Sequence, residues 1–146
     1  MNQATYSKHV WITPPGALID GAAMTTTEVD TAGYDFVKVV VGIGATNTAM
    51  TVLKVRLTDT PGSGYTDITG GDFSVSPATL PAATDDNTFW VVYVDMRGKS
   101  GRYLDLSGTV GSTSTGGYYC AWAELSRANE APNSVSERGV SQALFV

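Results

Sequence analysis

The sequence predicts an all-β protein, an antiparallel β-sandwich or jelly-roll-like barrel with extended N- and C-terminal arms. Short apolar segments with a period of two recur at roughly ten-residue spacing, and Gly, Pro, Asn and Asp stand at the breaks between them. No segment between the two ends has a convincing helical period. With 146 residues, of which 42% are hydrophobic and only 16% charged, the chain has the size and composition of one folded domain.

Two segments carry the clearest strand pattern, YDFVKVVVGI at 34–43 and TVLKVRLTD at 51–59. Successive side chains of a strand point to opposite faces, so alternate positions share a face. The residues predicted to point inward are Val37, Val39, Val41 and Ile43 in the first segment, and Thr51, Leu53, Val55 and Leu57 in the second. The connecting GATNTAM is rich in turn residues, which predicts a hairpin between the two strands.

The remaining strands follow from the same alternation. They are expected at 67–75, 88–96, 102–108 and 117–126, with one or two weaker strands between residues 17 and 33. In TFWVVYVDM (88–96) both sets of alternate positions are apolar, which predicts a central strand covered on two faces. The Gly- and Ser-rich stretch GTVGSTSTGG (108–117) is expected to be a flexible loop.

The two ends of the chain differ from this strand pattern. The first residues are polar and close with the break Pro14-Pro15-Gly16, and SRANEAPNSVSERGVSQ near the end lacks the apolar density of a strand. We therefore expect an N-terminal arm at 1–16, a β-sandwich domain at 17–126 and a C-terminal arm at 127–146.

The C-terminal arm finishes on four apolar residues, Ala143 to Val146. Leaving Leu144 and Phe145 in water forgoes about 1.5–3 kcal/mol each relative to burial. Two interpretations follow from this cost. The tail folds back onto its own sheet, or it crosses to another subunit or a larger surface.

Charge and hydropathy limit the classes of partner. Fourteen acidic against nine basic residues give a net charge of −5, and the bases are scattered, so nucleic acid is not expected as a partner. No stretch approaches the roughly 18–20 apolar residues that span a bilayer, and we expect no membrane partner. The opening residues have no apolar core of a signal peptide, which predicts synthesis and residence in a cytosol.

Residues that carry chemistry are few. His9 is the only histidine and Cys120 the only cysteine, so neither a His-dependent catalytic set nor a zinc site is expected; Cys120 is predicted to be a small buried apolar residue. Asp85-Asp86-Asn87 is rich in oxygen but lacks the spacing of a calcium loop. Gly98-Lys99-Ser100 resembles the end of a phosphate loop, but its first glycine is missing. We expect no catalytic residues, no metal, no cofactor and no enzyme activity.

The aromatic residues of the predicted strands suggest carbohydrate binding as a different activity. Four of them, Trp90, Tyr103, Tyr118 and Trp122, would form a sugar-stacking platform if they were exposed together, although aromatic residues also fill the cores of sandwiches. A carbohydrate- or receptor-binding module is therefore kept as an alternative function.

Three runs of the sequence carry a resemblance to a known group of proteins. They are GYDFVKVVVGIGATNTAMTVLKVRLTD, LPAATDDNTFWVVYVDMRGKSGRYLDLSG and SRANEAPNSVSERGVSQALFV, and the similarity covers about residues 17–146. The chain resembles small all-β structural proteins of tailed phages and prophages, in particular capsid decoration (cement) proteins. This resemblance contains no catalytic signature.

The resemblance implies a virion component that is made in the cytoplasm of a bacterial host. It implies a homotrimer that binds the major capsid protein on the outer surface of the head and stabilises the shell. The residues expected to contact the capsid or other subunits are Trp11, Pro14, Pro15, Leu144, Phe145 and Val146. A receptor-binding module of a phage tail and a single jelly-roll coat subunit are the alternatives.

Overall fold

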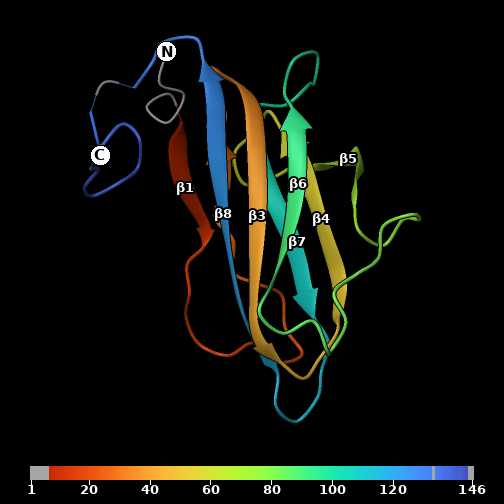
Figure 1. Cartoon of the computed structure of the whole chain (residues 1–146). Helices are drawn as coiled ribbons and strands as arrows, with labels where there is room; N and C mark the ends of the chain where they lie inside the picture. Colours follow the sequence, from red (N-terminus) through yellow and green to blue (C-terminus); the bar gives the residue numbers. More distant parts are fainter. Residues whose placement is uncertain (1–6, 133, 145–146) are drawn as a thin grey trace.

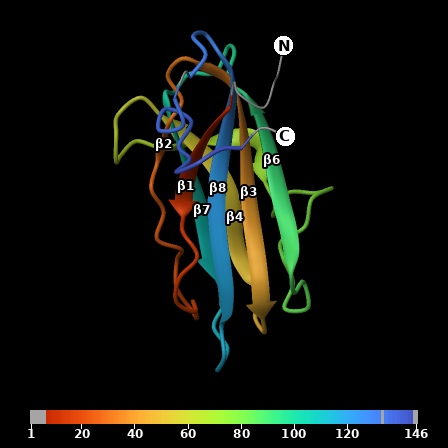
Figure 2. The same ribbon diagram turned by 60° about the vertical axis from the view of Figure 1, so that its left-hand side comes forward.

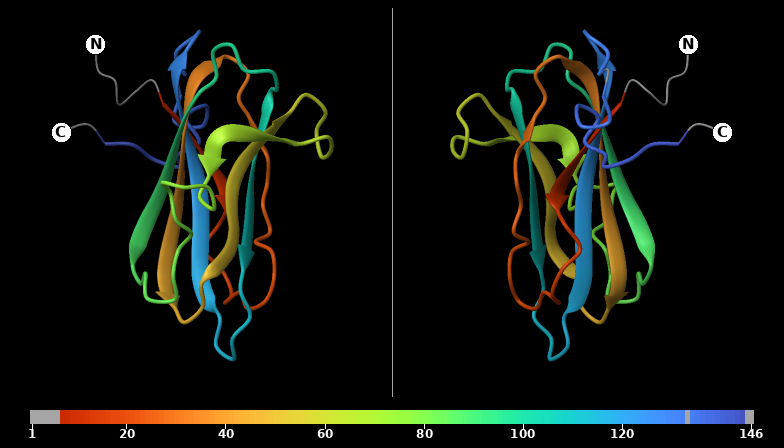
Figure 3. Two further views of the ribbon diagram at one scale, coloured as in Figure 1. Left: turned by 90° about the vertical axis from the view of Figure 1, so that its right-hand side faces the viewer. Right: turned by 90° about the vertical axis from the view of Figure 1, so that its left-hand side faces the viewer.

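The computed structural model describes residues 7–132 and 134–144, and within these ranges the protein is all-β and contains no helix. The strands form two four-stranded antiparallel sheets, which face each other as two layers and do not close into a barrel (Figure 1 and Figure 3). They are β1 (Lys8–Thr13), β2 (Val29–Asp30), β3 (Tyr34–Thr46), β4 (Met50–Thr58), β5 (Thr66–Asp72), β6 (Thr88–Asp95), β7 (Tyr103–Val110) and β8 (Gly117–Ala128). The predicted all-β class is therefore confirmed.

The pairing of the strands joins distant parts of the sequence. The first sheet has the order β1-β8-β3-β6, which Figure 2 shows side by side, and the second has the order β2-β7-β4-β5. Four antiparallel pairs each join one of the first four strands to one of the last four: β1 with β8, β2 with β7, β3 with β6, and β4 with β5. Apart from the consecutive strands β4 and β5, the fold consequently depends on pairing between strands that are far apart in the sequence.

The predicted hairpin between the two clearest strands is wrong, because β3 lies in the first sheet and β4 in the second. The chain crosses between the layers, and two threonines hold the crossing. The hydroxyl of Thr46 lies 2.7 Å from the hydroxyl of Tyr119, and the hydroxyl of Thr48 donates to the carbonyl of Gly111 at 2.9 Å. Turn residues indicate where a chain changes direction, but not which sheet it enters next.

A shared hydrophobic core fills the space between the layers. Seven of the eight residues predicted to point inward are buried, namely Val37, Val39, Val41, Ile43, Leu53, Val55 and Leu57. Thr51 is exposed, so that prediction is wrong. The register shifts between Met50 and Val52, and the shift turns Met50 into the core instead.

The strand β6 lies at an edge of the first sheet, so its predicted central position is wrong. Val94 is buried and Trp90 packs against the core, whereas Phe89 and Tyr93 are 70% and 66% exposed. Apolar residues on both faces are typical of a covered central strand, but an edge strand with an exposed apolar face has the same pattern.

The N-terminal segment predicted as an arm at 1–16 contributes a strand to the first sheet. Residues 8–13 form β1, which pairs with β8, and Ile12 is fully buried in the core. The strand KHVWIT begins with two polar residues, which hide its alternation in the sequence. Residues 1–6 of the predicted arm lie outside the described residues.

The C-terminal segment is also partly folded. Residues 134–140 form a compact turn, whereas the sequence predicts an extended arm at 127–146. The turn is closed reciprocally: the N–H of Ser134 donates to the Glu137 carboxylate at 3.0 Å, and the N–H of Glu137 donates to the Ser134 hydroxyl at 3.2 Å. This Ser-x-x-Glu arrangement is a capping box of the kind that opens helices.

Candidate functional site

The outer faces of the two sheets differ in chemistry. The second sheet has an outer surface of paired charges, which we call the polar face (Lys54, Arg56, Tyr65, Asp67 and Asp105). Lys54 donates to Asp67 at 2.6 Å, Arg56 donates to Asp105 at 2.8 Å, and the Arg56 guanidinium lies 4.5 Å from the centroid of the Tyr65 ring. Its charges are already satisfied within the chain.

The first sheet presents an apolar outer surface instead, which we call the aromatic face (Trp11, Phe36, Val40, Phe89, Val91, Tyr93, Tyr118 and Trp122). The register of the strands aligns these residues in rows. Trp11 of β1 lies opposite Trp122 of β8, Trp122 opposite Val40 of β3, and Val40 opposite Val91 of β6. One apolar row therefore crosses all four strands.

Ring contacts hold the aromatic face together. The Trp11 and Trp122 rings meet edge to face, with centroids 6.1 Å apart, and Phe89 contacts Trp122 in the same manner at 6.2 Å. Phe36 and Tyr93 stack with centroids 6.3 Å apart. Such pairs fix the orientation of rings that remain partly in water.

Charged residues on this face occur in pairs. Lys38 and Glu124, opposite each other on β3 and β8, form an ion pair near its middle. At one end, Asp95 is paired with Arg97, whose guanidinium holds the pKa of the Asp95 carboxyl well below its usual range. The face is thus apolar with locally neutralised charges.

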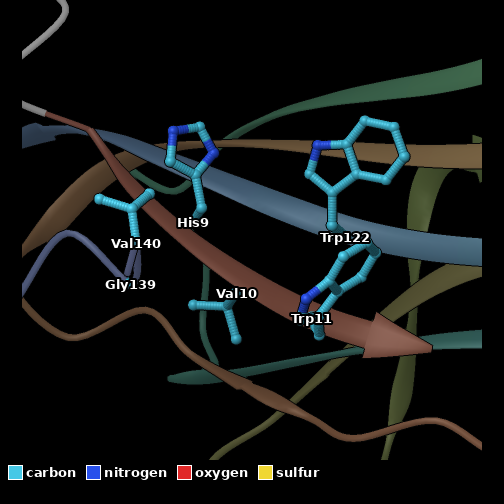
Figure 4. Close-up of a pocket in the computed structure, with 6 residues that line it drawn as sticks. All are labelled: His9, Val10, Trp11, Trp122, Gly139 and Val140. Carbon is cyan, nitrogen blue, oxygen red and sulfur yellow. The ribbon is translucent and has the colours of Figure 1, made fainter. Parts of the chain in front are cut away.

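Two hollows of the described surface are each lined by aromatic-face residues from two strands. The first has a volume of about 320 Å³ and is lined by His9, Val10, Trp11, Trp122, Gly139 and Val140, so it lies between β1, β8 and the C-terminal turn (Figure 4). The second has a volume of about 380 Å³; Gly42 and Gly44 of β3 lie in it between Phe89 and Tyr118.

The C-terminal turn docks on β1 beside the first hollow. The N–H of His9 donates to the carbonyl of Arg138 at 2.8 Å. Gly139 has a positive φ of 71°, and a Cβ at this position would collide with the carbonyl oxygen of His9. A glycine is therefore required for this contact.

The residues predicted to make capsid or subunit contacts are only partly brought together. Trp11 is 52% exposed on the aromatic face, and Pro15 lines the second hollow, with Pro14 exposed beside it. Leu144 is 83% exposed, away from the core. Phe145 and Val146 lie outside the described residues.

Sequence reasoning missed the contribution of β6 to this site. Phe89, Val91 and Tyr93 lie on the aromatic face, although the sequence predicts that the segment is covered on both sides. The available signal is that FWVVYV (89–94) carries apolar or aromatic side chains on both faces, which an edge strand tolerates only if its surface is used or protected.

The four aromatic residues predicted as a sugar platform do not share one surface. Tyr118 and Trp122 lie on the aromatic face, but Trp90 turns inward and packs edge to face against Phe73 at 5.3 Å. Tyr103 belongs to the second sheet, where the Arg102 guanidinium lies 5.2 Å from the centroid of its ring.

The residues considered for metal binding or thiol chemistry make contacts that support the fold. Asp86 accepts the N–H of Thr46 at 2.7 Å, and Asp85 accepts the N–H of Ala82 at 2.7 Å. Cys120 is half-buried next to Gly42, and not fully buried as predicted. Across residues 7–132 and 134–144, no three His, Cys, Asp or Glu side chains come together as potential metal ligands.

No protein-family model matches the chain, and no curated protein matches it. The described part of the chain contains no helix with the length and hydropathy of a membrane span.

Proposed function

We propose that the chain is a bacteriophage capsid decoration protein, which binds the major capsid protein on the outer surface of the head, stabilises the shell and catalyses no reaction. The aromatic face is the observation that carries this proposal. Exposed apolar surfaces rimmed by polar residues mark interaction sites, because leaving them in water is costly. Trp11 and Tyr118, both about half exposed, are the proposed anchors.

The proposal includes a jelly-roll topology for the two layers. The strand orders β1-β8-β3-β6 and β2-β7-β4-β5 support it, since they are what results when one long antiparallel hairpin is wrapped into two sheets. Jelly rolls occur in viral capsid proteins and also in lectins, so we argue the function from the surface and not from the fold.

The physical role suits this surface. A protein that holds capsomers together needs a stiff body and a broad contact, and it needs no nucleophile. Several copies on one shell, or several subunits in one oligomer, would reinforce modest single contacts through high effective concentration. The polar face, with its charges paired internally, is left to face the solvent.

Co-sedimentation with capsids tests the proposal. Capsids would be assembled from the major capsid protein encoded in the same genome and mixed with the purified chain. We expect the wild type to sediment with the capsids and the double variant Trp11→Ser/Tyr118→Ser to stay in the supernatant. The control Lys54→Ser/Asp67→Ser removes an ion pair from the polar face and should sediment like the wild type.

Two outcomes would contradict the decoration role. If the aromatic-face variant sediments as fully as the wild type, this face is not the capsid-binding surface. If the purified chain alone forms shells that sediment without added capsid protein, the chain is a coat subunit.

Glycan binding is the second candidate, and the glycine-floored hollow favours it. Phe89 and Tyr118 flank Gly42 and Gly44, so a flat sugar ring could approach the backbone between two aromatic side chains. This candidate predicts a signal on a glycan array that Phe89→Ala and Tyr118→Ala both abolish. A blank array with the wild type would exclude it.

A further inference from the structure

The edges of the two sheets are protected to different degrees. Natural proteins protect edge strands with charges, bulges, short length or covering segments. Three edges follow this rule: β1 has a register shift and the docked C-terminal turn, β2 has only two residues, and β5 carries Asp67, Asp72 and a glycine of positive φ. The fourth edge, β6, is eight residues long and contains neither proline nor a basic residue.

The inner side of β6 is closed by the chain itself. Phe73 packs edge to face against Trp90, and Gly70 to Phe73 together with Ala78 flank a hollow of about 190 Å³ beside Val91 to Tyr93. Among the described strands, β6 pairs with β3 and with no strand on its other edge. An edge of this length and polarity is a template for another strand.

The sequence of β6 is complementary to itself. If two copies of TFWVVYVD are aligned antiparallel with Val91 opposite Val91, then Phe89 lies opposite Tyr93 and Trp90 opposite Val92. Every pair then joins residues of the same face. Asp95, the only charged residue of the strand, lies opposite Asn87, so no like charges meet.

We infer that the partner of this edge is a second copy of the same chain, paired through β6 about a two-fold axis. The two first sheets then form one continuous eight-stranded sheet, and the two aromatic faces form one surface. Cross-strand aromatic pairs between Phe89 and Tyr93 of the two copies stabilise the junction. A closed two-fold pair of this kind leaves no further β6 edge open to aggregation.

Mass in solution is the first test. Light scattering of the purified full chain should give twice the chain mass of 15.3 kDa at high concentration. Monomer at every concentration, or the trimer that the resemblance implies, would overturn the inference.

Charge at the two-fold axis is the second test. Val91→Lys places two lysines opposite each other, as Val91→Glu does with two glutamates, so each variant alone should be monomeric. An equal mixture of the two should recover the double mass, because a lysine then lies opposite a glutamate. Val135→Lys and Val135→Glu, at an exposed valine of the C-terminal turn, are matched controls that should pair like the wild type. Unchanged mass of the Val91 variants would contradict the inference.

A disulfide cross-link is a third test. Its expected result is a covalent dimer, which a variant that merely fails to fold would not give. Residues directly opposite each other in an antiparallel pair have Cβ atoms about 4.5–5.5 Å apart, close enough for a strained or slightly adjusted disulfide. In a Cys120→Ser background, Val91→Cys should form a covalent dimer on mild oxidation, and Val135→Cys should not. This inference is independent of the proposed function, since the capsid test changes Trp11 of β1 and Tyr118 of β8 and leaves the residues of β6 unchanged.

Discussion

Asp105 is a charged residue that is only 4% exposed, on the outer side of the second sheet. Burial of an unpaired carboxylate is costly, and two neighbours compensate for it. Arg56 donates to one oxygen at 2.8 Å, and the hydroxyl of Thr26 donates to the other at 3.0 Å. Arg56 lies in β4, Asp105 in β7 and Thr26 in the segment before β2. The two hydrogen bonds to Asp105 therefore connect that segment to the second sheet.

Replacing Arg56 by methionine tests the importance of this pair. Met keeps an apolar stem of similar length but leaves Asp105 with Thr26 alone, so we expect a loss of about 1–3 kcal/mol in the free energy of unfolding. Urea denaturation measures this change. The matched control is Arg97→Met, whose partner Asp95 is exposed, and its unfolding midpoint should not move. Equal midpoints for the two variants would mean that the burial of Asp105 contributes nothing.

At the scale of elements, the C-terminal turn and β1 depend on each other through one residue. Gly139 has a positive φ and lies against the backbone of His9, where a Cβ would collide with the carbonyl oxygen. Gly98 also has a positive φ, of 76°, but a Cβ there would meet nothing within 4 Å. Replacing each glycine by alanine therefore distinguishes two effects: both substitutions strain the backbone, but only the one at Gly139 also disrupts a contact.

We predict that Gly139→Ala detaches the turn from β1, whereas Gly98→Ala only adds backbone strain of about 1–2 kcal/mol. Amide hydrogen exchange followed by NMR measures the difference at the His9 N–H, which donates to the carbonyl of Arg138 in the wild type. Exchange at His9 should become fast in Gly139→Ala and stay slow in Gly98→Ala. Slow exchange at His9 in both variants would contradict the docking role.

An ion pair joins the short strand β2 to Arg102, the residue just before β7. Arg102 donates to both oxygens of Asp30, at 2.7 and 2.6 Å, and this pairing lowers the pKa of Asp30 below its ordinary value of 3.8. A lowered carboxyl pKa contributes stability that is fully present above 3.8 and is lost as the pH falls through the folded-state pKa.

Asp30→Asn should therefore lower the melting temperature at neutral pH, and its difference from the wild type should shrink as the pH falls below 3.8. The effect is small because both side chains are about half exposed. High salt should also reduce the difference at neutral pH, since it screens exposed pairs. A difference that persists at acid pH would show that the substituted amide perturbs β2 for a reason other than the lost ion pair.

The sequence predicts some elements well and others poorly, for identifiable reasons. Alternation locates β3 and most of β4, because their inward residues are nearly all branched aliphatics. It misses the edge position of β6, since two apolar faces do not distinguish a covered strand from an exposed one. The folded C-terminal turn is readable from Ser134-Val135-Ser136-Glu137 followed by Gly139, a capping-box pattern that is easily missed because no long apolar helix follows it.

At the scale of the whole molecule, the aromatic face exists only because distant strands become neighbours. Trp11, Val40, Val91 and Trp122 come from four strands spread over most of the chain, and only the strand order aligns them in one row. The spacing of strands in a sequence carries no record of that order. The sequence alone indicates neither the exposure of Phe89 and Tyr93 nor the assembly of the aromatic residues into one surface.

The end of the described segment belongs to this scale, because Leu144 lies outside the hydrophobic core. In the C-terminal turn the N–H of Val140 donates to the carbonyl of Val135 at 3.0 Å, and beyond this turn Leu144 is 83% exposed. Deleting residues 143–146 should therefore leave the melting temperature and the β-sheet circular dichroism unchanged. We predict that the same deletion weakens capsid co-sedimentation, since the exposed side chain of Leu144 gains by burial against a partner. A control chain with Leu144, Phe145 and Val146 all replaced by serine keeps the length and should show the same weakening. Undiminished binding by both chains would place the whole contact on the aromatic face, and a lowered melting temperature would mean that the tail packs on its own sheet.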